Sequence, residues 1–315
     1  MKSPLRFVVA GAGAFGREHL RILAGIPGAE IAGIADRDAS ALAAAADRYG
    51  AGDRDTDALA LIGRVRPDGL IVATPGATHV PLARHALGLG IPVLVEKPVA
   101  LTAAEAGLLV EAERQSGAFV LPGHILRFSE PYRQLVEIAR SPEIGRILSV
   151  TARRHRDDSH AVRYREDPVL MTMIHDIDLA IWITGAAAGD VVASRRPVGT
   201  SRSETLMTGT GAGGAVWRLS TAWTFPAASC PPDRIEVIGE AGSVELEFGN
   251  AIRSFGPAPR HIDISRVEAD QPHRAELDYF AACIASGKKP AVVTLAEAIA
   301  GLETSDAILA ALRNA

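Results

Sequence analysis

The chain has 315 residues, 48% of them hydrophobic and 22% charged, which is ordinary for a globular protein of about two domains. Its formal net charge of -4 argues against a nucleic-acid-binding surface, and no apolar run of about 18 residues predicts a membrane span. No signal peptide is predicted, and the two cysteines, Cys230 and Cys283, suggest neither a metal site nor a disulfide framework, so we expect a cytoplasmic protein.

The chain opens with an apolar run from Leu5 that breaks into Gly11, Gly13 and Gly16, spaced as G-x-G-x-x-G, before a helical pattern over Arg17–Ala24. In a dinucleotide-binding turn the first glycine lets the chain leave the strand sharply, and the second lets a pyrophosphate approach the backbone. The third lets the helix pack close to the strand, so the positive end of the helix faces the phosphates. The predicted phosphate loop is Gly11, Ala12, Gly13, Ala14, Phe15 and Gly16.

A second predicted strand, Ala29–Ala35, ends in Asp36, which follows Gly16 by about the 20 residues that the dinucleotide fingerprint requires. The Asp36 carboxylate can accept hydrogen bonds from both ribose hydroxyls and would repel a 2′-phosphate, which favours NAD. Arg37 could weaken that discrimination and leaves NADP open. The alternative is an ordinary glycine turn beside a surface aspartate, but the spacing favours a dinucleotide site.

Strands and helices then alternate, which predicts an α/β fold with a Rossmann-type, doubly wound parallel sheet. The expected helices and strands are Asp38–Tyr49, Asp55–Arg66, Gly69–Ala73, Thr78–Leu89, Ile91–Val95, Thr102–Gly117 and Ala118–Leu121. Pro122-Gly123 is a natural boundary between a dinucleotide-binding domain of residues 1–122 and a substrate-binding and oligomerisation domain of residues 123–315.

Ligands of such sheets bind beyond the carboxyl ends of the strands. The loops at Thr74–Gly76 and Glu96-Lys97 follow two of these strands, so we expect them to lie near Asp36. Lys97 comes before a proline that keeps the backbone extended, and we expect its ammonium to point into the cleft. Lys97 could otherwise be a surface lysine. Thr74 could be an ordinary loop residue, and His79 could be an ordinary histidine early in a helix. Besides Asp36 and Arg37, the residues predicted to contact the cofactor are Thr74, Pro75, His79, Glu96 and Lys97.

In the second half the hydrophobic pattern changes to several alternating segments. This pattern predicts an α+β domain with a large, mostly antiparallel open sheet that carries helices on one face. The open face is expected to form a homodimer or homotetramer interface, because a flat apolar face must be covered. Arg154–Asp167 is strongly charged and predicted to be irregular. The expected helices and strands are Ser129–Arg140, Ile147–Arg153, Met171–Thr184, Glu204–Thr210, Ala215–Phe225, Asp233–Gly239, Ser243–Phe248, Arg274–Ser286 and Thr294–Arg313.

Several motifs occur in a fixed order: Gly11–Gly16, Asp36, Val72-Ala73-Thr74-Pro75 with His79, Glu96-Lys97-Pro98, Arg127-Phe128, Gly145-Arg146-Ile147 and His175-Asp176-Ile177-Asp178. In this set the chain resembles the glucose–fructose oxidoreductase/inositol dehydrogenase/rhizopine catabolism (Gfo/Idh/MocA) family of NAD(P)-dependent oxidoreductases. The resemblance covers the Rossmann half and about a third of the second half. It implies hydride transfer between nicotinamide and a secondary alcohol of a sugar, cyclitol or related polyol.

Two residues suit that chemistry. His175 can take the hydroxyl proton because an imidazole titrates near neutral pH, and Lys97 can stabilise the developing alkoxide charge. The resemblance implies these same two catalytic roles. His175 could otherwise be a helix histidine satisfied by a backbone carbonyl or by Asp178.

The chain departs from the family pattern at Met171, one helical turn before His175, where many members carry an aspartate. A thioether cannot replace that carboxylate. Either catalysis relies on Lys97 and His175 alone, or another group replaces the carboxylate, with Asp157, Asp158, Asp176 and Asp178 as candidates. A second departure is Gly76, where family members often carry an asparagine.

The substrate is less clearly indicated. The residues predicted to contact it are Arg127, His155, Met171 and His175, with His124, Arg153, Arg156 and His160 as further candidates. The charged members could equally belong to a solvated loop, and their cationic excess would suit a phosphate or carboxylate as well as a neutral polyol. Two other functions stay open, namely an NAD-using glycoside hydrolase of the same fold and a catalytically silent dinucleotide-binding regulator.

Overall fold

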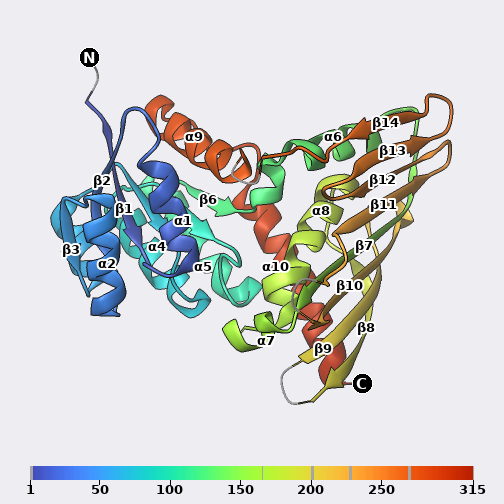
Figure 1. Cartoon of the computed structure of the whole chain (residues 1–315), viewed down its shortest axis with the longest axis horizontal. Helices are drawn as coiled ribbons and strands as arrows, with labels where there is room; N and C mark the ends of the chain where they lie inside the picture. Colours follow the sequence, from blue (N-terminus) through green and yellow to red (C-terminus); the bar gives the residue numbers. More distant parts are fainter. Residues whose placement is uncertain (1–2, 165, 200–201, 227–228, 269–270, 315) are drawn as a thin grey trace. The chain divides into compact units, whose positions relative to one another are not determined.

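The computed structural model describes residues 3–164, 166–199, 202–226, 229–268 and 271–314 (Figure 1). The chain forms two compact units. The first comprises the residues up to Ile125 together with Pro272–Ala298, and the second comprises Leu126–Gln271 with the residues from Ile299 onward. No helix within the described residues is both long and apolar enough to cross a membrane.

The first unit is built on a six-stranded parallel sheet with the strand order β3-β2-β1-β4-β5-β6. The order reverses between β1 and β4, which is the switch point of a doubly wound Rossmann sheet and confirms the predicted fold. Its strands are β1 (Leu5–Ala10), β2 (Ala29–Ala35), β3 (Asp53–Asp55), β4 (Gly69–Val72), β5 (Val93–Glu96) and β6 (Val120–Gly123). Its helices are α1 (Ala14–Leu23), α2 (Ala39–Tyr49), α3 (Ala58–Val65), the 3-10 turn η1 (Gly76–Thr78), α4 (His79–Gly88), α5 (Ala103–Ser116) and α9 (Gln271–Ser286).

Side-chain caps start α2, α3 and α5 of this unit. Asp38 accepts hydrogen bonds from the backbone N–H groups of Ser40 and Ala41 at the start of α2, and Thr102 accepts one from Glu105 at the start of α5. The helix predicted from Asp55 begins only at Ala58, since Asp55 belongs to β3 and Asp57 caps α3. The predicted boundary there was therefore wrong by three residues.

Helix α9 belongs to the first unit, although it is distant in sequence. Its Phe280 is fully buried, with its ring centroid 6.0 Å from those of Phe7 and Phe119. Gly69 on β4 faces Phe280 and Ile284, and a side chain there would collide with both. The division predicted at residue 122 assigned this helix to the second half, whereas its apolar face covers the Rossmann sheet.

The second unit is built on an eight-stranded sheet with the order β14-β13-β12-β11-β7-β10-β9-β8, antiparallel except for the pair β7 and β10. This strand order confirms the predicted, mostly antiparallel sheet. The sheet also contains β8, β13 and β14, which lie outside the four strand segments predicted between Glu204 and Phe248. The strands are β7 (Ile147–Asp157), β8 (Gly189–Val198), β9 (Arg202–Thr210), β10 (Val216–Phe225), β11 (Arg234–Gly239), β12 (Ser243–Glu247), β13 (Ala251–Phe255) and β14 (Arg260–Asp263).

One face of this sheet carries helices, and Figure 1 shows α6 and α8 against it. The core between them includes Ile177, Trp217 and Val237, all fully buried. The helical segments are η2 (Ile125–Phe128), α6 (Glu130–Ala139), α7 (Ser159–Arg163), η3 (Val169–Met173), α8 (Ile174–Thr184), η4 (Ala212–Gly214) and, from Ile299 onward, α10 (Leu295–Arg313).

The charged stretch from Arg154 to Asp167 is more regular than predicted. Strand β7 continues to Asp157 instead of ending at Arg153, and α7 follows within the same stretch. The strand continues because Arg154 is buried against acidic partners rather than solvated, as described below.

Candidate dinucleotide and active site

The glycine loop has the geometry that the fingerprint requires. Gly11 has φ +106°, and a Cβ there would lie 2.3 Å from the carbonyl oxygen of Ala73, while a Cβ at Gly16 would lie 1.8 Å from that of Gly11. Around Gly13, by contrast, a Cβ would meet nothing within 4 Å. Gly13 is also the N-cap of α1 and provides no side-chain cap, so the first N–H groups of the helix can bind an anion.

Asp36 is fixed against this loop at the end of β2. One carboxylate oxygen accepts a hydrogen bond from the backbone N–H of Ala12 at 2.6 Å, and the other accepts one from Asp38 at 2.8 Å. An ionised carboxylate has about four acceptor sites, so two remain for ribose hydroxyls. The carboxylate is thus oriented by the backbone before any ligand arrives.

A cavity of about 640 Å³ adjoins the glycine loop and Asp36 within the first unit. This volume lies within the range of about 300–1,000 Å³ that is typical of ligand pockets. The predicted residues that line it are Gly11, Gly13, Asp36, Arg37, Thr74 and Pro75. The cavity is also lined by Leu59, Pro81 and Leu82, which no sequence motif indicated and which add apolar surface suited to a flat adenine ring. These three residues lie near the starts of the helices that follow β3 and β4. Ligands bind at this end of a parallel sheet, so their position in the chain was the one sequence signal that could have indicated them.

His79 has both ring nitrogens engaged by the backbone. Nδ1 lies 2.8 Å from the carbonyl oxygen of Pro98, and Nε2 lies 2.7 Å from that of Thr74. His79 therefore connects the loops after β4 and β5 and positions Thr74, and these two backbone contacts do not favour its predicted contact with the cofactor. A Cβ at Gly76 would lie 2.9 Å from Leu101 Cδ2, so the Leu101 side chain would have to shift to admit the family asparagine.

Glu96 is the last residue of β5 and Lys97 follows it, and the two side chains have different surroundings. Glu96 is buried, and its Oε1 accepts a hydrogen bond from His19 Nε2 at 2.7 Å. Burial acts to raise the Glu96 pKa, but the His19 hydrogen bond and nearby positive charge outweigh it, and the pKa lies below its usual value. The Lys97 Nζ lies 5.6 Å from the ring centroid of Phe15, next to the phosphate loop. The structure thus brings Lys97 to the predicted cofactor site and directs Glu96 toward His19.

In the second unit a π-helical turn, η3, leads directly into α8 and contains Met171. Such turns are rare and often occur at functional sites. Within it Thr172 is buried and accepts a hydrogen bond from Trp223 Nε1 at 2.9 Å, whereas Met171 and His175 are only partly buried. The turn therefore presents Met171 and His175 at the surface of the unit.

The aspartates that flank His175 are buried beside arginines. Asp178 forms a bidentate pair with Arg127, whose guanidinium also lies 5.2 Å from the ring centroid of Trp182. Asp176 accepts two hydrogen bonds from Arg154, and burial raises its pKa to about 6. Arg127 is only 1% exposed, so this pairing does not favour its predicted contact with substrate.

The other two aspartates that were candidates to replace the family carboxylate lie beside α7. Asp157 ends β7 and accepts a hydrogen bond from the backbone N–H of Ser159 at 3.0 Å. Asp158 lies 3.6 Å from an Arg202 guanidinium nitrogen. Asp157 and Asp158 are therefore each engaged by another residue of the second unit, Ser159 and Arg202 respectively.

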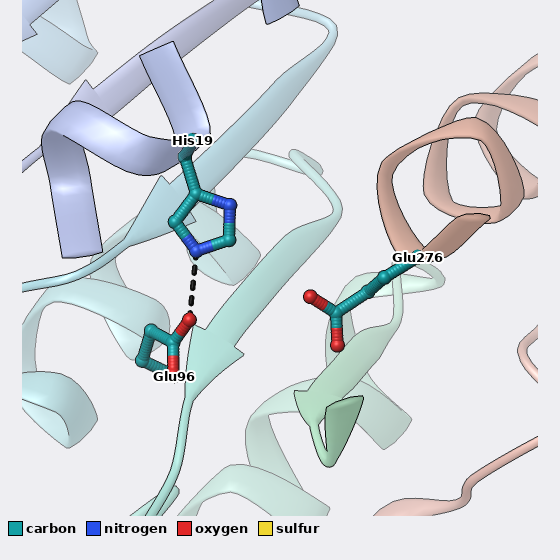
Figure 2. A group of neighbouring side chains, drawn as sticks. All are labelled: His19, Glu96 and Glu276. Atoms are coloured by element: carbon teal, nitrogen blue, oxygen red, sulfur yellow. Dashed lines mark hydrogen bonds and ion pairs between the residues drawn. The ribbon is translucent and has the colours of Figure 1, made fainter. Parts of the chain in front are cut away.

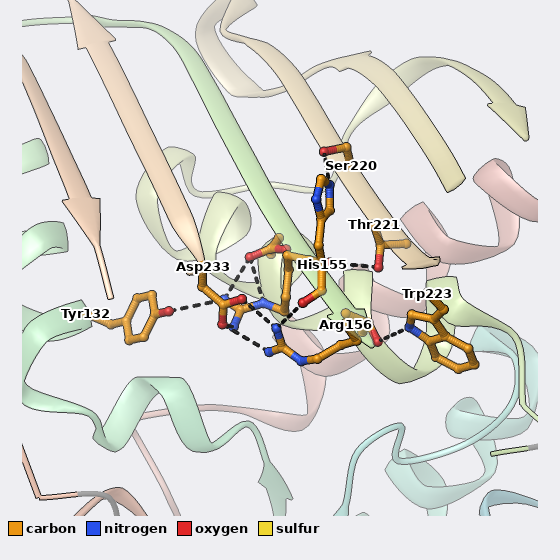
Figure 3. Close-up of polar contacts among 10 residues, drawn as sticks. Tyr132, His155, Arg156, Ser220, Thr221, Trp223 and Asp233 are labelled. Carbon is orange, nitrogen blue, oxygen red and sulfur yellow. Dashed lines mark hydrogen bonds and ion pairs between the residues drawn. The ribbon is translucent and has the colours of Figure 1, made fainter. Parts of the chain in front are cut away.

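Much of the charge predicted to face the substrate is neutralised within the second unit. Asp233 accepts hydrogen bonds from both Arg154 and Arg156, and Figure 3 shows Asp233 beside Arg156. Arg154 also donates a hydrogen bond to the Tyr132 hydroxyl oxygen. The pKa of Asp233 is lowered, because these arginines outweigh the effect of burial. The cationic excess of this stretch is therefore largely balanced by acids.

His155 faces away from the helices of its unit. Side chains alternate along a strand, and Arg154 points to the α8 side, so His155 stands on the opposite face of the sheet. There it contacts Ser220 (Figure 3). It also stacks on Phe225, with a ring-centroid separation of 5.4 Å. Burial and the charge of Arg153 lower its pKa to about 4. This position does not favour the predicted contact between His155 and a substrate near His175.

Two remaining candidates have mainly structural surroundings. His160 packs against the rings of Tyr164 and Trp223, and burial lowers its pKa. His124 is buried directly after β6.

Comparison with known proteins agrees with this geometry. Residues 5–124 match the family model of oxidoreductases with an NAD-binding Rossmann fold, and residues 132–245 match that of the GFO/IDH/MocA C-terminal domain. The chain belongs to the Gfo/Idh/MocA family. Membership in the Gfo/Idh/MocA family confirms the resemblance found in the motifs and the prediction of an NAD-binding domain.

Curated relatives within the Gfo/Idh/MocA family include inositol 2-dehydrogenases. That of Acidiphilium cryptum (strain JF-5) is 35% identical over 204 residues, covering 61% of this chain and 58% of the relative. That of Corynebacterium glutamicum (strain R) is 31% identical over 189 residues, covering 59% and 56%. The chain therefore matches less than two thirds of the length of these relatives.

Solved structures share the fold over nearly the whole chain. An oxidoreductase from Agrobacterium radiobacter in complex with NAD+, L-tartaric acid and magnesium has a TM-score of 0.89 at 19% identity, covering 99% of this chain and 97% of that one. Myo-inositol 2-dehydrogenase from Lactobacillus plantarum has a TM-score of 0.85 at 21% identity, covering 99% and 98%. At such identities the likeness establishes the Gfo/Idh/MocA fold alone.

Proposed function

We propose that the protein is a cytoplasmic, NAD-dependent dehydrogenase that oxidises a secondary alcohol of a sugar, cyclitol or related polyol, or reduces the corresponding ketone. The observation that carries the proposal is the position of Lys97, beside Phe15 and the phosphate loop of a Rossmann unit. The Asp36 carboxylate, already oriented by backbone N–H groups, supports NAD as the preferred cofactor. The names of the curated relatives support a cyclitol or a similar polyol as substrate.

We assign two catalytic roles to this chain. Lys97 donates a hydrogen bond to the reacting oxygen and stabilises the alkoxide-like charge that develops as the C–H bond breaks. His175 accepts the hydroxyl proton, so that the alcohol becomes a ketone with the loss of one hydride and one proton. The bound nicotinamide supplies the hydride acceptor. In the reverse direction His175 returns the proton to the carbonyl oxygen.

Substitution of either residue tests this assignment. We expect Lys97→Ala and His175→Ala each to lower kcat by roughly 10²–10⁴-fold, which is the usual contribution of general acid–base catalysis. The Kd for NADH, measured by fluorescence titration, should stay close to that of the wild type in His175→Ala. A panel of sugars, cyclitols and sugar acids with NAD and NADP identifies the substrate for the assay.

A matched control removes a histidine elsewhere in the second unit. His261 is exposed on β14, and His261→Ala should keep wild-type turnover. Unchanged turnover in both Lys97→Ala and His175→Ala would contradict the proposed roles.

Met171 favours one second candidate, a dinucleotide-binding regulator without turnover. A thioether occupies the position of the family aspartate, and Asp176 and Asp178 are both buried beside arginines. Tight NADH binding by the wild type, together with no turnover across the whole polyol panel, would support this candidate over the dehydrogenase.

We also propose that the open face of the eight-stranded sheet forms a homodimer or homotetramer interface. Val192, Leu206, Val216 and Ile238 expose between 36% and 67% of their surface on four of its strands. An exposed apolar face of this kind is typical of a binding surface. The mass of the protein in solution, measured by light scattering, checks this proposal.

A further inference from the structure

A buried polar cluster lies within the first unit, on three segments that are far apart in sequence. His19 comes from α1, Glu96 from the end of β5 and Glu276 from α9 (Figure 2). His19 and Glu276 have no exposed surface, and Glu96 is 9% exposed. One ring nitrogen of His19 and one oxygen of each carboxylate all lie within 4.8 Å of one another.

Several atoms of this cluster have no hydrogen-bond partner among the described residues. They are both carboxylate oxygens of Glu276 and Nδ1 of His19. Figure 2 shows the Glu276 carboxylate directed toward the His19–Glu96 pair. Buried polar atoms in native proteins are nearly always paired, so the two orphaned oxygens of Glu276, which face the His19–Glu96 pair, indicate that a further species belongs between them.

The chemistry of the cluster selects a cation. Two carboxylates this close repel each other when both are ionised, and neither an anion nor an apolar group would relieve that repulsion. His19 Nε2 lies 2.7 Å from Glu96 Oε1, so an ion bound by both would replace this hydrogen bond, with the imidazole proton on Nδ1.

We propose that His19, Glu96 and Glu276 form a buried site for one divalent transition-metal ion, with zinc as the best match. An imidazole and carboxylates are common zinc ligands, whereas magnesium and calcium prefer oxygen ligands alone. Bonds of about 2.0–2.2 Å place three ligands of one zinc ion about 3.5–3.8 Å apart at most, so the side chains, whose ligand atoms lie within 4.8 Å of one another, would move by about an ångström to close around an ion.

The ion would have a structural role. It would join α9 to α1 and to the end of β5, and so connect positions 19, 96 and 276 of the first unit. Glu96 Oε2 also accepts a hydrogen bond from the backbone N–H of Lys97 at 3.2 Å, so the ion would fix the backbone that carries Lys97. The proposal does not depend on the proposed dehydrogenase activity.

Metal content and thermal unfolding of the whole chain test the site, with any affinity tag removed. Protein produced in zinc-replete medium should contain one zinc ion per chain by inductively coupled plasma mass spectrometry. Removal of zinc with a strong chelator should lower the unfolding temperature, and added Zn²⁺, but not Mg²⁺, should restore it. Added Co²⁺ should produce the visible absorption of a cobalt–nitrogen/oxygen site.

Two ligand variants and one control complete the test. Glu276→Gln and His19→Gln should lose the bound zinc and the response of the unfolding temperature to Zn²⁺. Asp278→Asn changes an exposed acid on the same helix, paired only with Arg274 in the described contacts, and should keep both. Wild-type protein without stoichiometric zinc, whose unfolding temperature does not respond to Zn²⁺, would overturn the proposal even if the variants failed to fold. The Glu276 carboxyl group would then hold a proton instead.

Discussion

At Asp36 both carboxylate oxygens accept backbone hydrogen bonds, from Ala12 and Asp38, so a substitution there removes an oriented group without touching the core. We expect Asp36→Ser to weaken NAD binding by about 1.5–3 kcal/mol, or about tenfold to a hundredfold, because hydrogen bonds to a charged acceptor are lost. NADP should gain relative to NAD, since the charge that repels a 2′-phosphate is gone and Arg37 remains. The ratio of kcat/KM for the two cofactors measures this change.

Asp57 offers a control for that experiment within the same cavity. Its carboxylate caps α3 by accepting hydrogen bonds from the N–H groups of Leu59 and Ala60. Asparagine caps helices about as well as aspartate, so Asp57→Asn should change the cofactor ratio little. An unchanged NAD preference in Asp36→Ser would show that another group selects the cofactor.

At the scale of single elements, the Rossmann half follows from local signals. The caps at Asp38 and Thr102 and the left-handed Gly50 and Gly117 act within a few residues of the helix ends that they define, so the sequence predicts those ends closely. The glycine loop is equally local, because the backbone contacts of Gly11 and Gly16 require glycine there. These elements need no knowledge of the rest of the chain.

Strand β7 shows where local patterns stop being informative. Its continuation past Arg153 depends on Asp176 and Asp233, which come from other elements and pair with the buried Arg154. Without those partners a run of arginines and aspartates is best interpreted as a solvated loop. The predicted substrate contacts of His155 and Arg127 lack support because they also depend on distant residues. His155 stacks on Phe225 on the open face of the sheet, and Arg127 is held in a buried ion pair with Asp178.

The surroundings of His155 on β7 predict a dependence of stability on pH. The folded pKa of about 4 lies below the unfolded value of 6.5, so the unfolded chain binds the proton first as the pH falls. Its contribution to stability is full above about pH 6.5 and is lost as the pH falls toward 4. A shift of this size would equal about 3 kcal/mol for a fully buried group, and we expect about 1 kcal/mol for this half-buried one.

Denaturant unfolding of His155→Gln at several pH values checks this expectation. The free energy of unfolding should fall less steeply between pH 6.5 and 4 in the variant than in the wild type. His261→Gln, which changes an exposed histidine on β14, should keep the wild-type slope. Identical slopes in wild type and His155→Gln would mean that the imidazole does not resist protonation in the folded state.

For the whole molecule, the first unit is discontinuous in sequence. The chain leaves it after Ile125, builds the second unit, and returns with α9. Motifs and capping signals report on neighbours in sequence, so they placed the division at residue 122 and gave no sign of this return. The signal lies instead in packing, because Phe280 and the buried Glu276 both lie on the face of α9 that completes the Rossmann unit.

This arrangement predicts which unit each core substitution weakens. Phe280→Ala removes a fully buried ring packed between Phe7 and Phe119, and should cost about 3–5 kcal/mol. Ile308→Ala removes an equally buried side chain from the core of the second unit, and should cost about 2–5 kcal/mol. Hydrogen exchange should accelerate mainly in β1, β4 and β6 for Phe280→Ala, and mainly in β10 and β11 for Ile308→Ala. Faster exchange of the second sheet in Phe280→Ala, with the first sheet unchanged, would contradict the assignment of α9, because a helix weakens first the core against which it packs.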